Sequence, residues 1–162
     1  MIPTLRNVDV SNRARPRLRI PRGSVPRLLH WLDRNPSIPP PVGGDLSVVF
    51  LGWRSMCRLH EQFLGDPSPT DVITFPATEP GLEGGEICVC PEMADRNARQ
   101  LGLPFARELT LYLVHGWLHL AGYEDHTPAQ RSRMRAAENV LMEGIHHSIG
   151  IPSFHWIPPN TR

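Results

Sequence analysis

Residues 109–128 read LTLYLVHGWLHLAGYEDHTP, and no other stretch of the 162-residue chain says as much about its structure. Residues 105–121 are almost continuously apolar, and the run stops just before Gly122, a residue that tolerates the left-handed backbone of a helix end. We therefore expect a central helix here. His115 and His119 interrupt the apolar run four residues apart, so both imidazoles project from one face of that helix.

Two histidines at this spacing can bind one metal ion. Gly122 ends the helix, so the chain can turn back and bring Asp125 or His126 toward the same point. An imidazole without a partner is costly to bury, which favours a metal site over an ordinary pair of helix residues. Three protein ligands leave one position open, as in catalytic zinc sites. We therefore expect one zinc ion per chain, bound by His115, His119 and either Asp125 or His126.

The residue after the first histidine excludes one kind of metalloenzyme. Metalloproteases with two histidines at this spacing carry a glutamate there as the general base. This sequence has Gly116 at that position, so a peptidase that uses the same mechanism is disfavoured.

The segments around this helix predict an α+β fold. Helices and strands mix without strict alternation, so we expect a single small domain with a mixed sheet of about four strands packed with helices, and the metal site on the central helix. The prolines of residues 35–45 predict a loop. The expected strands lie at 17–20, 46–52, 71–76 and 85–91. One further helix is expected to begin after Ser24 as its N-cap, and three others are expected at 54–65, 91–102 and 127–144.

Two of these helices show which residues should face the core. Apolar residues recur at helical spacing in both, and the polar residues between them include several arginines. The residues expected to point inward are Met56, Leu59 and Phe63 in the first helix, and Met134, Ala137 and Leu141 in the second.

The charge of the chain is unevenly distributed. The formal net charge is +1 at pH 7, and all 17 basic residues are arginine. Residues 1–34 carry eight arginines against Asp9 and Asp33, whereas residues 35–162 carry nine against fourteen acidic residues. Coding bias explains such a composition, but arginine also binds phosphate in a bidentate manner. The basic end is therefore a candidate for RNA binding.

Residues 1–15 are polar and aperiodic, and residues 146–162 are interrupted by prolines. We expect a flexible basic arm over residues 1–15, a metallohydrolase domain over 16–145 and a C-terminal tail over 146–162. No apolar run approaches the roughly 18 residues that span a bilayer, and the first residues contain no apolar signal segment. Three cysteines are too few for a disulfide framework. These features predict a cytoplasmic protein with no membrane partner.

Three segments resemble the YbeY family of bacterial metal-dependent endoribonucleases. They are PTDVITFP (69–76), GGEICVCPEMADRNA (84–98) and ELTLYLVHGWLHLAGYEDH (108–126). The resemblance extends from about residue 46 to 145 in the family's order and spacing. It implies a zinc-dependent endoribonuclease specific for single-stranded RNA, which trims the 3′ end of small-subunit (16S) ribosomal RNA and takes part in ribosome quality control. Ribosomal RNA and the ribosome are the implied partners.

The sequence departs from the family pattern at two places. The family motif is H-x3-H-x5-H, and its third histidine falls on Asp125, with His126 one residue later. Asp125 keeps the following helix in register and is a competent zinc ligand, so we favour it and keep His126 as the alternative. Leu64 occupies a position where the family usually has an arginine thought to serve the phosphate. Arg58 or Arg107 could take that role.

Two other functions remain open, and several residues have two interpretations. A metallohydrolase of a non-RNA substrate would use the same ligands, and a ribosome-associated binding factor would hold a structural metal. Cys88 and Cys90 are interpreted as core residues rather than a second metal site, and Trp117 as core rather than a stacking platform for RNA. Asp71 could fix a loop or line the site, and Glu86 could be a base or a surface residue.

Overall fold

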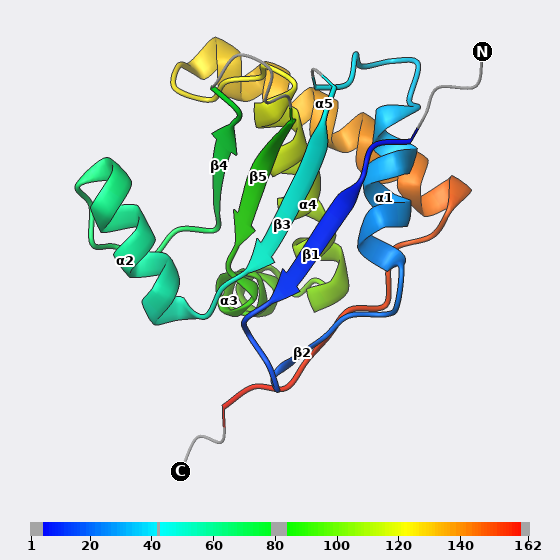
Figure 1. Ribbon diagram of the computed structural model, residues 1–162. Coiled ribbons are helices and arrows are strands. Elements are labelled where there is room, and N and C mark those ends of the chain that lie inside the picture. Colours follow the sequence, from blue (N-terminus) through cyan, green and yellow to red (C-terminus); the bar gives the residue numbers. More distant parts are fainter. Residues whose placement is uncertain (1–4, 42, 79–83, 160–162) are drawn as a thin grey trace.

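The structure, a computed structural model, describes residues 5–41, 43–78 and 84–159. A four-stranded sheet forms its centre, with the strand order β1-β3-β5-β4 (Figure 1). The first three strands in that order run parallel, and β4 is antiparallel to β5. This is the mixed α+β sheet predicted from the sequence. The strands are β1 (Val8–Asn12), β3 (Asp45–Phe50), β4 (Val72–Pro76) and β5 (Gly84–Val89).

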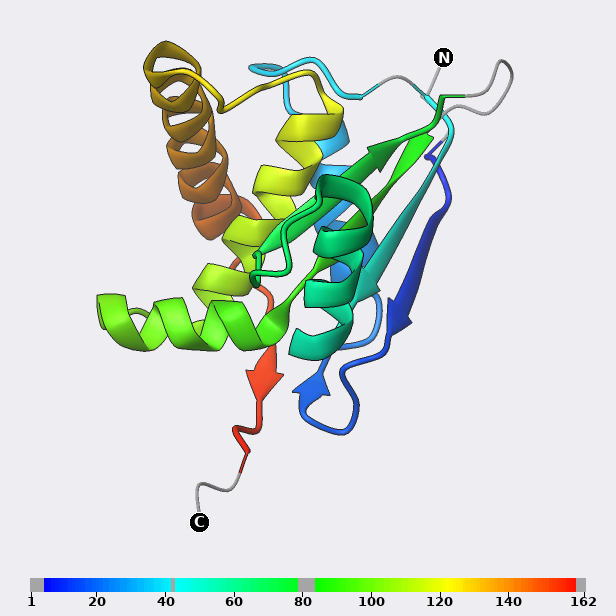
Figure 2. The same ribbon diagram turned by 90° about the vertical axis from the view of Figure 1, so that its left-hand side faces the viewer.

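Helices cover both faces of this sheet. α1 and α4 pack on one face, with α5 packed against these two helices, and α2 packs on the other face (Figures 1 and 2). α3 packs against α4 near one end of the sheet. No helix in the described part of the chain combines the length and hydrophobicity needed to cross a bilayer. The helices are α1 (Ser24–Asp33), α2 (Trp53–Leu64), α3 (Pro91–Leu101), α4 (Phe105–Leu120) and α5 (Pro128–Ser148).

The core is divided because side chains alternate between the two faces of a strand. Val48 and Ile87 point to the larger core, with α4 and α5. Val49 and Cys88 point to the smaller core, where Met56 of α2 meets them. In α5 the three residues expected to face inward, Met134, Ala137 and Leu141, are all buried, as predicted.

Strand β1 lies within the segment 1–15, for which the sequence predicted a flexible arm. The structure differs from that prediction over residues 8–12, which pair in register with residues 46–50 of β3. Val8 and Val10 pack against the larger core, and Asp9 between them is exposed. Two valines are too short an alternation to identify a strand, and only the pairing with β3 reveals it. Residues 1–4 lie outside the described part.

The segments beyond the main sheet also pair with each other. β2 (Leu18–Arg19) and β6 (His155–Trp156) form a two-stranded antiparallel sheet. The strand expected at 17–20 is therefore short, and part of the expected tail is ordered: α5 continues to Ser148, and Phe154 and Trp156 join the larger core. Residues 79–83 of the acidic loop and residues 160–162 lie outside the described part.

Two local predictions are wrong. Ser24 does not cap α1: its hydroxyl donates to the carbonyl of Pro21 at 2.7 Å, and Gly23 with φ 73° occupies the N-cap position. Phe63 is 55% exposed instead of facing inward. Met56 is the buried residue of α2, while Phe63 lies in its last turn and forms an edge-to-face pair with Phe75, with ring centroids 4.9 Å apart.

Candidate metal site

Helix α4 lies close to the sheet because of Gly116. A Cβ atom at this position would meet Cγ2 of Ile87 at 2.6 Å and Cγ1 of Val72 at 3.1 Å. A larger residue would therefore push the helix away from β4 and β5. In the sequence, Gly116 indicated only that the glutamate of a metalloprotease is missing. The structure shows that the glycine also allows α4 to pack closely against the sheet. It sets how closely α4, which carries both histidines, approaches the sheet.

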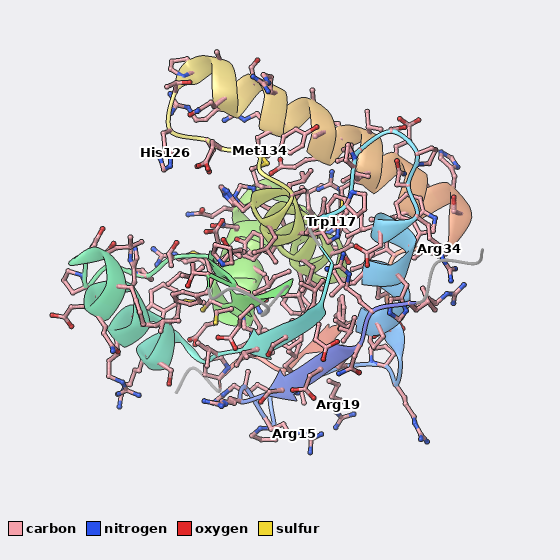
Figure 3. All side chains as sticks on the ribbon, turned by 45° about the horizontal axis from the view of Figure 1, so that its top comes forward. Arg15, Arg19, Arg34, Trp117, His126 and Met134 are labelled. Carbon is pink, nitrogen blue, oxygen red and sulfur yellow. The ribbon has the colours of Figure 1, made fainter. Side chains whose placement is uncertain are left out.

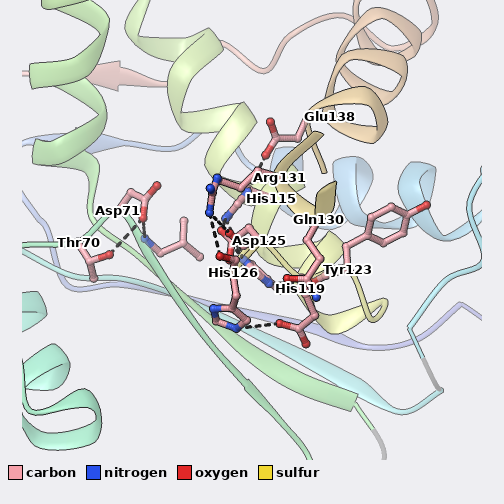
Figure 4. A network of polar contacts seen from close by, with 12 residues as sticks. Thr70, Asp71, His115, His119, Tyr123, Asp125, His126, Gln130, Arg131 and Glu138 are labelled. Carbon is pink, nitrogen blue, oxygen red and sulfur yellow. Dashed lines mark hydrogen bonds and ion pairs between the residues drawn. The ribbon is translucent and has the colours of Figure 1, made fainter. Parts of the chain in front are cut away.

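Three side chains meet at one point beside α4 (Figure 4). The Nε2 atoms of His115 and His119 are 2.9 Å apart, and each lies 3.6 Å from Oδ2 of Asp125. One ligand atom from each of the three residues lies within 4.8 Å of the other two. Their side chains are 19%, 21% and 36% exposed, so the cluster is open to solvent on one side. The HxxxH pair and the aspartate thus form a candidate metal site.

His126 does not join this cluster. Its side chain is 79% exposed, and its Nε2 atom lies 3.1 Å from Oε2 of Glu124. Gly122, with φ 95°, turns the chain after α4, and the residues that follow have no helical structure until α5. Adjacent residues of such a segment project in different directions, so Asp125 faces the histidines and His126 faces solvent.

The other ring nitrogen of each histidine is held by an acceptor. Nδ1 of His115 lies 2.6 Å from Oε1 of Glu138, and Nδ1 of His119 lies 2.9 Å from the carbonyl oxygen of Tyr123. Because both partners accept, each Nδ1 must carry its proton and donate it. The Nε2 atoms then face the cluster as potential ligands, which is how metal-binding histidines are oriented in many sites.

The electrostatics of the cluster favour a cation. Burial alone lowers the pKa of His115, but the hydrogen bond and negative charge of Glu138 outweigh it, with further contributions from Asp71 and Asp125, so the pKa is raised overall. Two ring nitrogens 2.9 Å apart beside a carboxylate repel each other unless a proton or a metal ion lies between them. Two imidazoles and one carboxylate suit zinc. The residues present therefore fit the expected ion.

The loop that carries Asp125 is fastened to the start of α5. Nη1 of Arg131 donates to the carbonyl oxygens of Asp125 at 3.2 Å and His126 at 2.9 Å. Thr127 caps α5 and exchanges hydrogen bonds with Gln130. Sequence reasoning missed the roles of Arg131 and Glu138. The Thr127-x-x-Gln130 pattern is a readable capping box, but which residues of α5 reach the site depends on how α5 packs.

Asp71 lies near the site without joining the cluster. Its carboxylate accepts from the backbone N–H of Val72 at 2.8 Å and from the hydroxyl of Thr70 at 3.2 Å (Figure 4). It therefore fixes the turn before β4, as one of its two interpretations proposed. Its charge also helps to raise the pKa of His115.

The remaining candidates are structural. Cys88 and Cys90 are buried in the core. Burial, and to a smaller extent the neighbouring Glu86, raises the pKa of Cys88 to about 12. Burial likewise raises the pKa of Cys90 to about 11. Oε1 of Glu86 accepts from the Cys88 thiol at 3.3 Å. Trp117 is fully buried, and its indole N–H donates to Oδ1 of Asp33 at 2.9 Å, so it is a core residue, as predicted.

The structure offers no direct replacement for the arginine that the family usually has at the position of Leu64. Leu64 is 67% exposed at the end of α2. Arg58 donates to the hydroxyl of Ser55 at 3.2 Å, and Arg107 lies 3.4 Å from Oε1 of Glu108. No contact found among the described residues joins either arginine to the cluster. Arg131 is instead the cation that contacts the loop of the site.

Comparisons with known proteins place the chain among endoribonucleases of one family. The family model described as "Endoribonuclease YbeY" matches residues 24–146. The chain is 36% identical over 118 residues to Endoribonuclease YbeY of Kineococcus radiotolerans, covering 67% of this chain and 68% of that protein. It is also 36% identical over 101 residues to the protein of that name from Chlorobium luteolum, covering 62% and 74%. The solution structure of TM1509 from Thermotoga maritima superposes with a TM-score of 0.57 at 28% identity, covering 86% of this chain and 89% of that one.

Proposed function

This chain belongs to the YbeY endoribonuclease family, and on that basis we propose that it cleaves single-stranded RNA at a zinc ion bound by His115, His119 and Asp125. We further propose that its substrate is the 3′ end of 16S ribosomal RNA, that the ribosome is its partner in maturation and quality control, and that it works in the cytoplasm. These finer assignments rest on the family.

The convergence of three ligand atoms within 4.8 Å carries the proposal. His115 and His119 supply two neutral nitrogen ligands, and Asp125 supplies one negative oxygen. Three ligands from the protein leave a further position for a reactant, which is typical of catalytic rather than structural zinc. The partial exposure of all three side chains gives a phosphodiester access to that position.

The residues of the chain hold and orient this centre. A zinc ion bound there would lower the pKa of a coordinated water to about 7 and polarise a phosphoryl oxygen. Glu138 accepts a hydrogen bond from Nδ1–H of His115, which keeps the ring oriented and its Nε2 atom basic. The carbonyl of Tyr123 does the same for His119. Arg131 holds the loop of Asp125 through two backbone carbonyls and places a positive charge beside the cluster.

The test compares metal-free and zinc-loaded protein on two RNAs of the same sequence, one single-stranded and one in a duplex. We expect cleavage of the single strand only, and only with zinc. His115→Ala should lose both zinc and cleavage. His146→Ala, which removes an exposed histidine of α5, is the matched control and should keep both.

Three results would overturn the proposal. Cleavage by the chelated protein would remove the metal from the reaction. Zinc binding without any cleavage of RNA would indicate a binding factor with a structural metal. Hydrolysis of simple esters or peptides but not of RNA would indicate a metallohydrolase of another substrate class.

A further inference from the structure

Four exposed arginines line two adjoining hollows beside β1 and the start of α1. The first hollow, about 560 Å³, is lined by Arg15, Arg19 and Arg22. The second, about 270 Å³, is lined by Arg22 and Arg27, and the two share the backbone around Arg22. We call Arg15, Arg19, Arg22 and Arg27 the arginine surface. None of the residues that line either hollow is acidic.

The charges of this surface are not neutralised within the part of the chain that the structure describes. None of its four arginines forms an ion pair there, whereas Arg99 pairs with Asp95. The nearest acidic residues in the sequence are Asp9 of β1 and Asp33 of α1. Asp9 alternates with Val8 and Val10, which line the first hollow, and therefore points to the other face of the sheet. Asp33 is paired with Arg6.

The arginine surface is separate from the metal site. It lies beside β1, at one edge of the sheet, whereas β4 forms the opposite edge. α4 carries the histidines and rests on β4 and β5 through Gly116. Three strand spacings, about 14 Å, separate the two edges. Figure 3 shows Arg15 and Arg19 at the opposite end of the molecule from His126, the neighbour of Asp125.

We propose that the arginine surface binds the phosphodiester backbone of a folded part of the RNA substrate, at a distance from the metal site. This inference rests on the proposed function. Guanidinium groups match phosphate oxygens in a bidentate manner, and four of them without a neighbouring carboxylate attract phosphates regardless of base sequence. The protein would then hold RNA at β1 while a single-stranded segment reaches the cluster.

The shape of the surface favours RNA over an anionic membrane. A lipid surface is nearly flat and would meet side chains that protrude from a convex face. Here the arginines line two concave sites side by side. Successive phosphates of a folded nucleic acid strand can enter such hollows one after another.

The test is a fourfold variant, Arg15→Gln, Arg19→Gln, Arg22→Gln and Arg27→Gln. Substitution is preferable to truncation because removal of residues 1–15 would also remove β1 from the sheet. The probe is a stem–loop RNA with a single-stranded extension, and its affinity is measured by fluorescence anisotropy from 50 to 200 mM salt. If each arginine neutralises one phosphate, the unchanged protein should lose about 50- to 150-fold more affinity than the variant over that range, the lower figure for single-stranded and the higher for double-stranded RNA.

A second variant controls for net charge. Arg34→Gln, Arg54→Gln, Arg133→Gln and Arg135→Gln remove four exposed arginines from the end of α1, from α2 and from α5, and none of these forms an ion pair among the described residues. This control should keep the salt dependence of the unchanged protein. Thermal unfolding and zinc content, measured on all three proteins, should be equal.

Failure of the inference is distinguishable from failure of the proposed function. A short single-stranded oligonucleotide, too small to span both sites, should be cleaved equally by all three proteins; if none cleaves it, the proposed function fails. If cleavage occurs but both fourfold variants lose affinity equally, or neither does, the inference is wrong. It is also wrong if the first variant loses binding only to phosphatidylserine vesicles, which would make the surface a membrane contact.

Discussion

Asp125 and His126 are neighbours in the chain but have opposite environments. Oδ2 of Asp125 lies 3.6 Å from both histidine nitrogens, while His126 pairs with Glu124 in solvent. In the family motif a histidine takes the place of Asp125. A carboxylate there would lower the charge of a metal ion bound at the candidate site by one unit relative to a neutral imidazole. The candidate site thus has three potential ligands, one of which is a harder donor than histidine.

The two residues should differ when each is replaced. Asp125→Ala removes one of three ligands and should weaken zinc binding by more than about 100-fold, since even the loss of a hydrogen-bond partner of a ligand costs about 10 to 100-fold. His126→Ala should leave the affinity unchanged. Competition with a chromophoric chelator measures both. A larger loss from His126→Ala would show that the loop rearranges around the metal.

Glu108 predicts a pH dependence of stability. Its side chain is buried, and burial raises the pKa of the carboxyl group. The charge of Arg107 lowers this pKa, whereas the charges of Asp71 and Glu138 raise it further. The pKa of Glu108 therefore lies above the ordinary 4.5. A carboxyl group with a raised folded pKa favours folding when protonated, so its contribution is fully present below pH 4.5 and is lost as pH rises through the raised pKa.

Glu108→Gln cannot ionise and should remove that loss. The difference in free energy of unfolding between the variant and the unchanged protein should therefore favour the variant more at pH 7 than at pH 4. Urea unfolding at several pH values measures the difference. Glu61→Gln, at an exposed position of α2, is the matched control. A difference between Glu108→Gln and the unchanged protein that does not vary with pH would contradict the prediction.

At the level of elements, α4 and the strands β3, β4 and β5 were predictable from the sequence, and the edge strand β1 was not. The long apolar run of residues 105–121 and the β-branched run of β3 have strong local patterns, and the HxxxH spacing specifies one helical face. β1 has only Val8 and Val10, and its identity as a strand comes from pairing with β3. Ser24 resembles an N-cap, but the turn that ends at Gly23 uses its hydroxyl elsewhere.

The same contrast holds within the site. The histidine pair follows from sequence spacing alone, because both ligands lie on one helix. Asp125 was preferred over His126 only by register with a family motif. Glu138 and Arg131 reach the site from α5, and their roles depend on the packing of α5 against α4, which no local pattern encodes.

Gly116 provides a test of how α4 is seated. Gly116→Val would place side-chain atoms where Ile87 and Val72 already lie, and should lower the free energy of unfolding by about 3 kcal/mol. Ala136→Val, on the exposed side of α5, introduces the same residue into a helix and should cost about 0.5 kcal/mol. Chemical denaturation measures both. Equal effects would show that helix propensity, not close packing, selects the glycine.

Across the whole molecule, Asp33 links parts of the chain that are distant in sequence. Its Oδ2 atom lies 2.8 Å from Nε of Arg6, and its Oδ1 atom accepts from Trp117. Arg6 also donates to the carbonyls of Pro41 and Gly44. One arginine thus joins the segment before β1 to α1, to the loop before β3 and, through Asp33, to α4.

Removal of Arg6 should therefore destabilise the fold as a whole. The side chains of Arg6 and Asp33 are 9% and 13% exposed, so Arg6→Ala leaves a mostly buried carboxylate without its cation, at a cost of about 3 kcal/mol. Arg34→Ala, next in sequence to Asp33 but exposed, is the control and should change stability little. Similar effects of the two substitutions on denaturant unfolding would show that the ion pair contributes nothing specific.

The pairing of β2 with β6 has a consequence for the order in which the protein is completed during synthesis. Leu18 pairs with Trp156, which is added 138 positions later. At the usual elongation rate of 5 to 20 residues per second, Leu18 waits about 7 to 28 s for its partner. Leu18 and Arg19 also line the first hollow of the arginine surface. That surface therefore takes its final form only once residues 155–156 have been made, after the strands of the main sheet.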